Sequence, residues 1–283
     1  MTRLPQTCAP RIGDFTSPCL ACGRQRGQTA GMCSLPTAPK PDLTSEITDL
    51  ALAYRRANGP VITVMQRFGG TLESQMSRLP PQFRAQIERA IVAALTRAHI
   101  VAGHTEKGPH LGRGGVMAAA IATGAAGGAG GIASSLMELP VTVTVFLHAI
   151  RAEARSAGFD PSNDGIRAAC LEVFSDASPL RQDDGMNTAF LSARLALTGP
   201  AVHKIIATVA PRLALVLGQK LAAQAVPVLG AASGAAINAA YLSYYTEIAR
   251  IRFALMRLAQ IHGGEAVAKA FEAACAPKII KAR

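Results

Sequence analysis

Apolar side chains recur along most of the chain at steps of three and four residues, the period typical of an amphipathic helix. The first such set is Leu43, Ile47, Leu50 and Tyr54. It predicts a helix over 42–57, because the turn-forming Asn58-Gly59-Pro60 follows. The same period predicts helices over 60–79 (interrupted at Gly69-Gly70), 80–101, 162–174, 188–198, 201–209, 211–225, 227–261 and 264–275.

The segment that begins at Pro140 shows two patterns. Val and Thr alternate over Val141–Val145, which favours a strand on propensity. Proline is well tolerated in the first turn of a helix, and Arg151 and Arg155 then share one helical face, so we expect a helix beginning at Pro140. Nothing after the N-terminal tail requires a β-sheet. The sequence therefore predicts an all-α fold, a single multi-helix domain over 42–277.

Two runs of small residues, 114–137 and 227–246, hold no charged side chain. In both runs small or polar residues are spaced by four, namely Gly127, Gly131 and Ser135, and then Gly230, Gly234 and Asn238. Residues four apart share a helix face, and small ones let another backbone approach closely. We expect two Gly/Ala-rich helical segments that pack closely, and a weak internal repeat.

The run 114–137 is long enough to reach across a bilayer. Its strongly apolar residues are only Val116, Ile121, Ile132 and Leu136, and its seven glycines weaken a helix. Composition therefore argues against a constitutive span. A close-packed core hairpin fits better, as does a hairpin that enters a membrane only on a trigger.

The formal net charge of +11 is concentrated at the two ends of the chain. Residues 1–41 carry five basic side chains against Asp14, and the tail 278–283 carries three more. Basic tails suit an anionic membrane surface. They would suit nucleic acid as well, but no nucleic-acid motif or aromatic platform accompanies them, so we expect no nucleic-acid partner.

The N-terminal tail is rich in Pro and Gly, which predicts disorder over 1–41. It holds Cys8, Cys19, Cys22 and Cys33, and the pair at 19 and 22 has the spacing of half a zinc site. The alternatives are a plain disordered tail, or an upstream extension of a protein that starts at Met32. No apolar leader segment is visible, so we expect a cytoplasmic protein, at the inner face of the membrane.

Other candidate chemistry is sparse. His99, His104 and His110 lie close together in sequence, but no carboxylate or Cys stands at ligand spacing, so we expect no metal. The segment Gly112–Gly115 lacks the Lys and Ser/Thr of a phosphate-binding loop. Cys170 and Cys275 are expected to be small buried hydrophobes. We therefore assign no catalytic residue and no cofactor.

Charged and amide side chains inside the apolar helical pattern form the candidate site. They are Glu138, Arg167, Glu172, Lys220, Asn238, Glu247 and Arg250. Buried charges must be paired, and a group of mixed sign in one pocket is a candidate binding or catalytic site. The alternative is a set of ion pairs that lock helices together, and we favour it.

Four of these segments together resemble the EcsC family of bacterial proteins. They are "ELPVTVTVFLHAI", "IRAACLEVF", "LGQKLAAQAVPVLGAASGAAIN" and "EIARIRFALMRL", in the order the family has them. The resemblance covers about Leu43 to Ala274. It implies a mostly helical domain and a bacterial envelope context beside an exporter, and it implies no reaction.

Matching positions by this resemblance are Glu138-Leu139-Pro140, Arg167, Leu171–Phe174, Lys220, Gln224, Pro227, Gly230, Asn238, Ala249-Arg250 and Phe253. The chain departs from the family pattern at His148, where Arg is expected, at Ser243 and Tyr244, where an Asp-His pair is expected, and at Arg252, where His is expected. These departures lower the expectation of an enzyme.

Three functions remain open from the sequence. The first is a membrane-peripheral accessory protein of the bacterial envelope or of an export system, bound to anionic lipid or to a membrane protein. The second is a soluble hydrolase with a carboxylate-based site around Glu138. The third is a purely structural partner protein.

Overall fold

The computed structural model describes residues 42–57, 81–102, 112–129, 131–176, 188–191, 204–211, 213–214 and 227–276. The chain divides after Lys40, and all of these residues belong to the second unit, Pro41–Arg283. Every secondary-structure element among them is a helix, which confirms the all-α prediction. The predicted N-terminal tail, the helix over 60–79, the loop with His104 and His110, and Lys220 lie outside the described residues.

Four helices follow the sequence pattern closely. They are α1 (Leu43–Ala57), α3 (Pro81–Ala102), α8 (Pro227–His262) and α9 (Gly264–Cys275). Pro81 occupies the first turn of α3, where its missing N–H costs no hydrogen bond. Gly263 separates α8 from α9 with φ of +88°, a conformation that glycine adopts without strain.

The first small-residue run differs from its prediction. It forms parts of two helices, α4 (Arg113–Ala129) and α5 (Gly131–Ser156), and not one. Gly127 therefore lies in α4 while Gly131 and Ser135 lie in α5, so the spacing of four does not place them on one helix face. The physical reason is the glycine-rich stretch itself, because glycine is a poor helix former and lets the chain turn.

The prediction that a helix begins at Pro140 is also wrong, because Pro140 lies inside α5. The remaining described elements are α6 (Asp164–Asp176) and the short 3-10 helix η2 (Thr188–Leu191). The helix predicted over 188–198 is thus a 3-10 turn at its start, and its remainder lies outside the described residues. Residues 204–211 are helical, within or beside two predicted helices.

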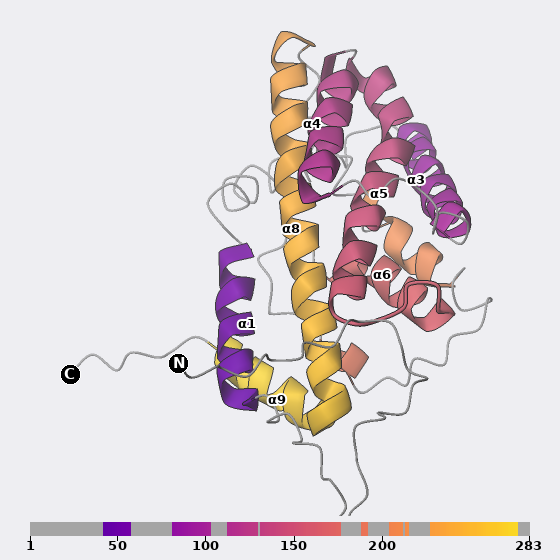
Figure 1. Cartoon of the computed structure of the whole chain (residues 1–283). Coiled ribbons are helices and arrows are strands. Elements are labelled where there is room, and N and C mark those ends of the chain that lie inside the picture. The colour runs from indigo at the N-terminus through magenta and orange to yellow at the C-terminus, as the bar shows by residue number, and fades with distance from the viewer. Residues whose placement is uncertain are drawn as a thin grey trace, which may run out of the picture. The chain divides into compact units, whose positions relative to one another are not determined.

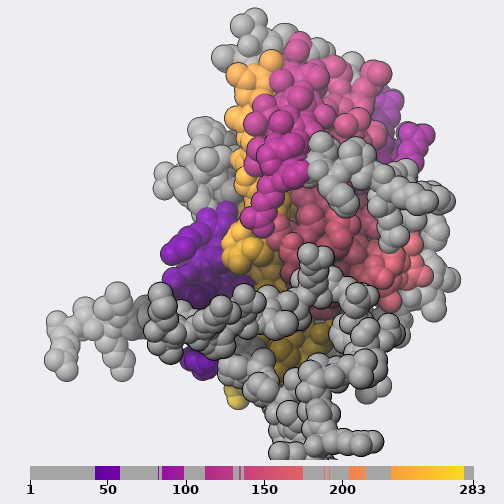
Figure 2. Space-filling model, viewed as in Figure 1, coloured from indigo at the N-terminus to yellow at the C-terminus, as the bar shows by residue number. Residues whose placement is uncertain are grey.

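The long helix α8 is the common packing partner in this unit. α4 and α5 pack along its N-terminal part, and α1 and α9 pack at its C-terminal part, with α3 on the outer side of α5 (Figure 1). Figure 2 shows α4 directly against the N-terminal part of α8, with α1 lower on the same face. An aromatic cluster lies inside, where Tyr245 contacts Phe146, Phe174, Tyr241 and Tyr244.

Candidate functional site

α4 and α8 cross with their backbones in contact at Gly124. A Cβ atom added there would lie 2.7 Å from the carbonyl carbon of Gly234 and 2.9 Å from Cβ of Asn238. Real Cβ atoms do not approach other atoms that closely, so no larger residue fits without a shift of a helix. The predicted close packing at Gly234 is therefore present, and its partner is Gly124.

A buried polar group lies beside this crossing. The Asn238 amide is fully buried, and its nitrogen donates to the Glu138 carboxylate at 2.8 Å and to the Ala120 carbonyl oxygen at 3.0 Å. The hydroxyl oxygens of Thr123 and Thr142 lie at 3.2 and 3.3 Å from the same nitrogen. These residues come from α4, α5 and α8, so one amide joins three helices.

Glu138 is itself buried in this group. The Thr142 hydroxyl donates to its carboxylate, and a Cβ on Gly127 would overlap that carboxylate. Gly127 also accepts a hydrogen bond at its carbonyl from the Ser134 hydroxyl, at 2.5 Å. Glycine at 127 thus makes room for a carboxylate, and the group as a whole fixes how α4, α5 and α8 meet.

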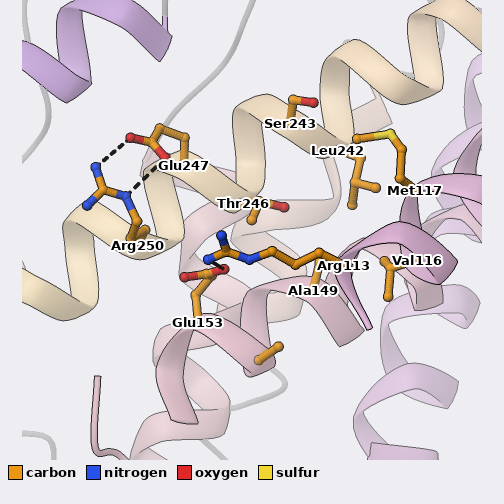
Figure 3. A pocket seen from close by; sticks show the side chains of 11 residues that line it. Arg113, Val116, Met117, Ala149, Glu153, Leu242, Ser243, Thr246, Glu247 and Arg250 are labelled. Carbon is orange, nitrogen blue, oxygen red and sulfur yellow. Dashed lines mark hydrogen bonds and ion pairs between the residues drawn. The ribbon is translucent and has the colours of Figure 1, made fainter. Parts of the chain in front are cut away.

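A cavity of about 430 Å³ lies further along the same three helices, between the start of α4, the C-terminal half of α5 and the middle of α8 (Figure 3). Its apolar lining residues are Val116, Met117, Ala149, Ala152 and Leu242. Its polar lining residues are Arg113, Glu153, Ser243, Thr246, Glu247 and Arg250.

Two ion pairs border this cavity. Arg113 contacts Glu153 at 3.0 Å, with the arginine side chain 82% exposed and the glutamate side chain 6% exposed. Arg250 binds Glu247 through two hydrogen bonds of 2.6 and 3.0 Å. The hydrogen bond to Glu247 raises the pKa of Arg250, and burial opposes this effect. The negative charges of the Glu247 and Glu153 carboxylates also raise the pKa of Arg250. Both carboxylates are thus matched by a guanidinium.

The predicted cluster is distributed over several places. Asn238 joins Glu138 at the crossing, and the Glu247–Arg250 pair borders the cavity. Glu172 on α6 instead binds the buried Arg252 on α8, and Arg167 pairs with Asp164 within α6 at 3.1 Å. Arg250 and Arg252 are two residues apart, which places their side chains on opposite sides of α8. The described members therefore do not converge on one pocket.

Sequence reasoning missed the two residues that pair across the cavity, Glu153 and Arg113. A signal for Glu153 was present, since it stands three residues after Ile150 and seven after Phe146, on the buried face of α5. A carboxylate on a buried face needs a partner. Arg113 carries no comparable signal, because it only precedes an uncharged run.

Among the described residues, no three His, Cys, Asp or Glu side chains stand together in a way that could hold a metal ion. None of the helices in the described ranges combines the length and the apolar content that crossing a membrane requires.

Comparisons with known proteins give one match. The model of the EcsC protein family matches residues 115–258, just over half of the 283-residue chain. No curated protein and no solved structure matches the chain. The matched region includes the α4–α8 crossing, the Asn238–Glu138 group and all of the cavity except Arg113. The chain belongs to the EcsC protein family.

Proposed function

We propose that this protein is a membrane-peripheral accessory protein of the bacterial envelope or of an export system, acting at the inner face of the membrane. It contacts an anionic membrane surface through the end of the domain where α4 finishes and α5 and α8 begin. We call this the uncharged end, comprising residues 118–129 of α4, 131–137 and Val141 of α5, and 227–238 of α8. The observation that carries the proposal is that, among the residues of this end that the structure describes, the exposed side chains are apolar and uncharged.

The exposed side chains of the uncharged end support lipid contact. Beyond Gly114, the exposed residues of α4 are all apolar: Ala118, Ile121, Ala122, Ala126 and Ala129. On α5, Met137 is 81% exposed and Val141 is 51% exposed, and their spacing of four places them on one face. Met137 and Val141 are thus a pair of large exposed apolar side chains on one helix face, and such a face is typical of a surface that another phase or partner covers.

The basic N-terminal tail supplies the attraction to anionic lipid. Four of the eleven net positive charges fall in 1–41. Each Lys or Arg near an anionic surface contributes about 1 kcal/mol, and this attraction weakens as salt screens it. Shallow apolar contact and a basic tail together resemble the two signals that stable peripheral binding needs.

The alternative of a hydrolase built on Glu138 has less support. That carboxylate accepts hydrogen bonds inside the helix crossing, and it is not among the residues that line the described cavity. A purely structural partner protein could use the same exposed apolar side chains, but it would not need the net positive charge of residues 1–41.

Vesicle flotation of the full chain tests the proposal. We expect the protein to float with phosphatidylcholine vesicles that contain phosphatidylglycerol, to stay behind with phosphatidylcholine alone, and to be released by high salt. Ile121→Asp should weaken binding about tenfold, because a carboxylate is costly to bring into an apolar membrane interface. Circular dichroism of each variant verifies that the fold is intact.

Ile261→Asp is the matched control. Ile121 and Ile261 are each 42% exposed, but Ile261 lies at the far end of α8. We expect the control to bind vesicles like the natural protein. Equal losses in both variants, or a natural protein that ignores anionic vesicles, would contradict the proposal.

A further inference from the structure

We propose that the cavity between α4, α5 and α8 binds a small organic cation, a primary amine on a short apolar chain, which replaces the Arg113 guanidinium at Glu153. This inference does not depend on the membrane proposal, because it rests on a different part of the domain.

The Arg113–Glu153 pair is asymmetric. The Glu153 side chain is 6% exposed, whereas the Arg113 side chain is 82% exposed and reaches in from the first residue of α4 (Figure 3). An exposed arginine gains little from an ion pair, because water already solvates it and holding it costs side-chain entropy. The largely buried Glu153 carboxylate, in contrast, is destabilised if its guanidinium leaves and no cation takes its place. Arg113 is therefore easily displaced by another cation.

The charges around the cavity select the sign of the ligand. Arg250 is held by Glu247 through two hydrogen bonds, so each of these side chains satisfies the other. When the Arg113 guanidinium leaves, Glu153, Glu247 and Arg250 remain, and together they carry one negative charge. A monovalent cation restores neutrality, whereas an anion would meet an excess of negative charge.

The apolar lining of the cavity selects what the cation carries. Val116, Met117 and Leu242 lie on one side of the cavity, away from Glu153 (Figure 3), and methionine adapts its shape to what it contacts. The Thr246 and Ser243 hydroxyls lie at the border of the cavity and can accept hydrogen bonds from an ammonium group. A volume of about 430 Å³ accommodates a short alkyl chain with its head group.

Calorimetric titration of the full chain with hexylamine tests this site. We expect hexylamine to bind and hexanoate and hexanol not to bind. Arg113→Ala should tighten hexylamine binding about two- to fivefold, because the competing guanidinium is gone. Glu153→Gln should weaken it about tenfold or more, because the buried carboxylate is the anchor.

Arg257→Ala is the control for Arg113→Ala. Arg257 is also an exposed arginine in an ion pair, with Glu46 at 3.2 Å, and it does not line the cavity. We expect this variant to bind hexylamine unchanged. Because Arg113→Ala alters only an exposed side chain, it remains informative if Glu153→Gln fails to fold.

Three results would overturn the inference. One is the absence of hexylamine binding to the natural protein and to Arg113→Ala. Another is hexanoate binding that Arg113→Ala weakens, which would make the cavity an anion site. The third is hexylamine binding that neither Arg113→Ala nor Glu153→Gln changes. Arg113→Ala should bind vesicles like the natural protein. The proposal of membrane binding and the proposal of a cation site can therefore fail separately.

Discussion

Gly124 shows how a single missing side chain sets the distance between two helices. Gly124→Ala should lower the free energy of unfolding by about 1–3 kcal/mol, the usual cost of overpacking a tight contact. The methyl group would meet the backbone of Gly234 and Cβ of Asn238, neither of which can rotate away. Urea unfolding followed by circular dichroism measures the loss.

Gly114→Ala on the same helix is the control. A Cβ at Gly114 would meet nothing within 4 Å, so the substitution changes only helix propensity. Alanine stabilises a helix by up to about 1 kcal/mol relative to glycine. We expect Gly114→Ala to be neutral or stabilising, and destabilisation of similar size in both variants would disprove the role given to Gly124.

At the residue scale the sequence predicted the kind of contact better than its partners. The spacing of Gly230, Gly234 and Asn238 indicated a surface meant for close approach, and Gly234 and Asn238 do meet another helix. That the opposite residue is Gly124 depends on how two helices about a hundred residues apart cross. Local spacing holds no information on such a crossing.

At the scale of elements, α6 depends on the residue that precedes it. The Asn163 side-chain oxygen accepts hydrogen bonds from the backbone N–H groups of Gly165 at 2.9 Å and Ile166 at 3.4 Å. These N–H groups have no partner inside the helix, so the side chain caps them. Asn163→Ala should cost about 1 kcal/mol in urea unfolding, and Asn163→Ser should retain most of the stability. Equal losses in the two variants would argue against a capping role.

Helix boundaries were predictable where a helix-ending residue stood clearly between two helical patterns. The period of α8 and α9 and the intervening Gly263 gave both helices almost to the residue. The break between α4 and α5 was not predicted, because a spacing of four among glycines fits one continuous helix as well as two. The predicted helix start at Pro140 was wrong for a related reason. Proline is common in the first turn of a helix, but it is also found inside helices, as in α5.

At the scale of the whole domain, the shared core keeps several weak acids neutral. Burial raises the pKa of the Cys170 thiol from 9.0 to about 12. Burial also raises the pKa of Tyr241 and of Tyr245, and for Tyr245 the neighbouring tyrosines add to it. Above pH 9 the unfolded chain releases protons that the folded domain still holds, so stability must fall as the solution becomes alkaline.

Urea unfolding measured at about pH 8 and at about pH 10.5 tests this. We expect each group that ionises only in the unfolded chain to lower the free energy of unfolding by about 1.4 kcal/mol per pH unit. Cys170→Ala removes one such group and should show a correspondingly shallower decline than the natural protein. Parallel declines in the two proteins would mean that Cys170 does not contribute.

The length of α4 determines how far the cavity stays from the hydrocarbon of a membrane that the tip of α4 enters. At about 1.5 Å per residue, the helix separates Ala129 from Arg113 by about 24 Å. The hydrocarbon of one bilayer leaflet is only about 15 Å thick. If α4 stands along the membrane normal with Ala129 foremost, the mouth of the cavity remains above the acyl chains at any depth the tip reaches within that leaflet. Anchoring and ligand entry would then occupy separate layers, and the domain could hold a lipid surface while its cavity stays open to water.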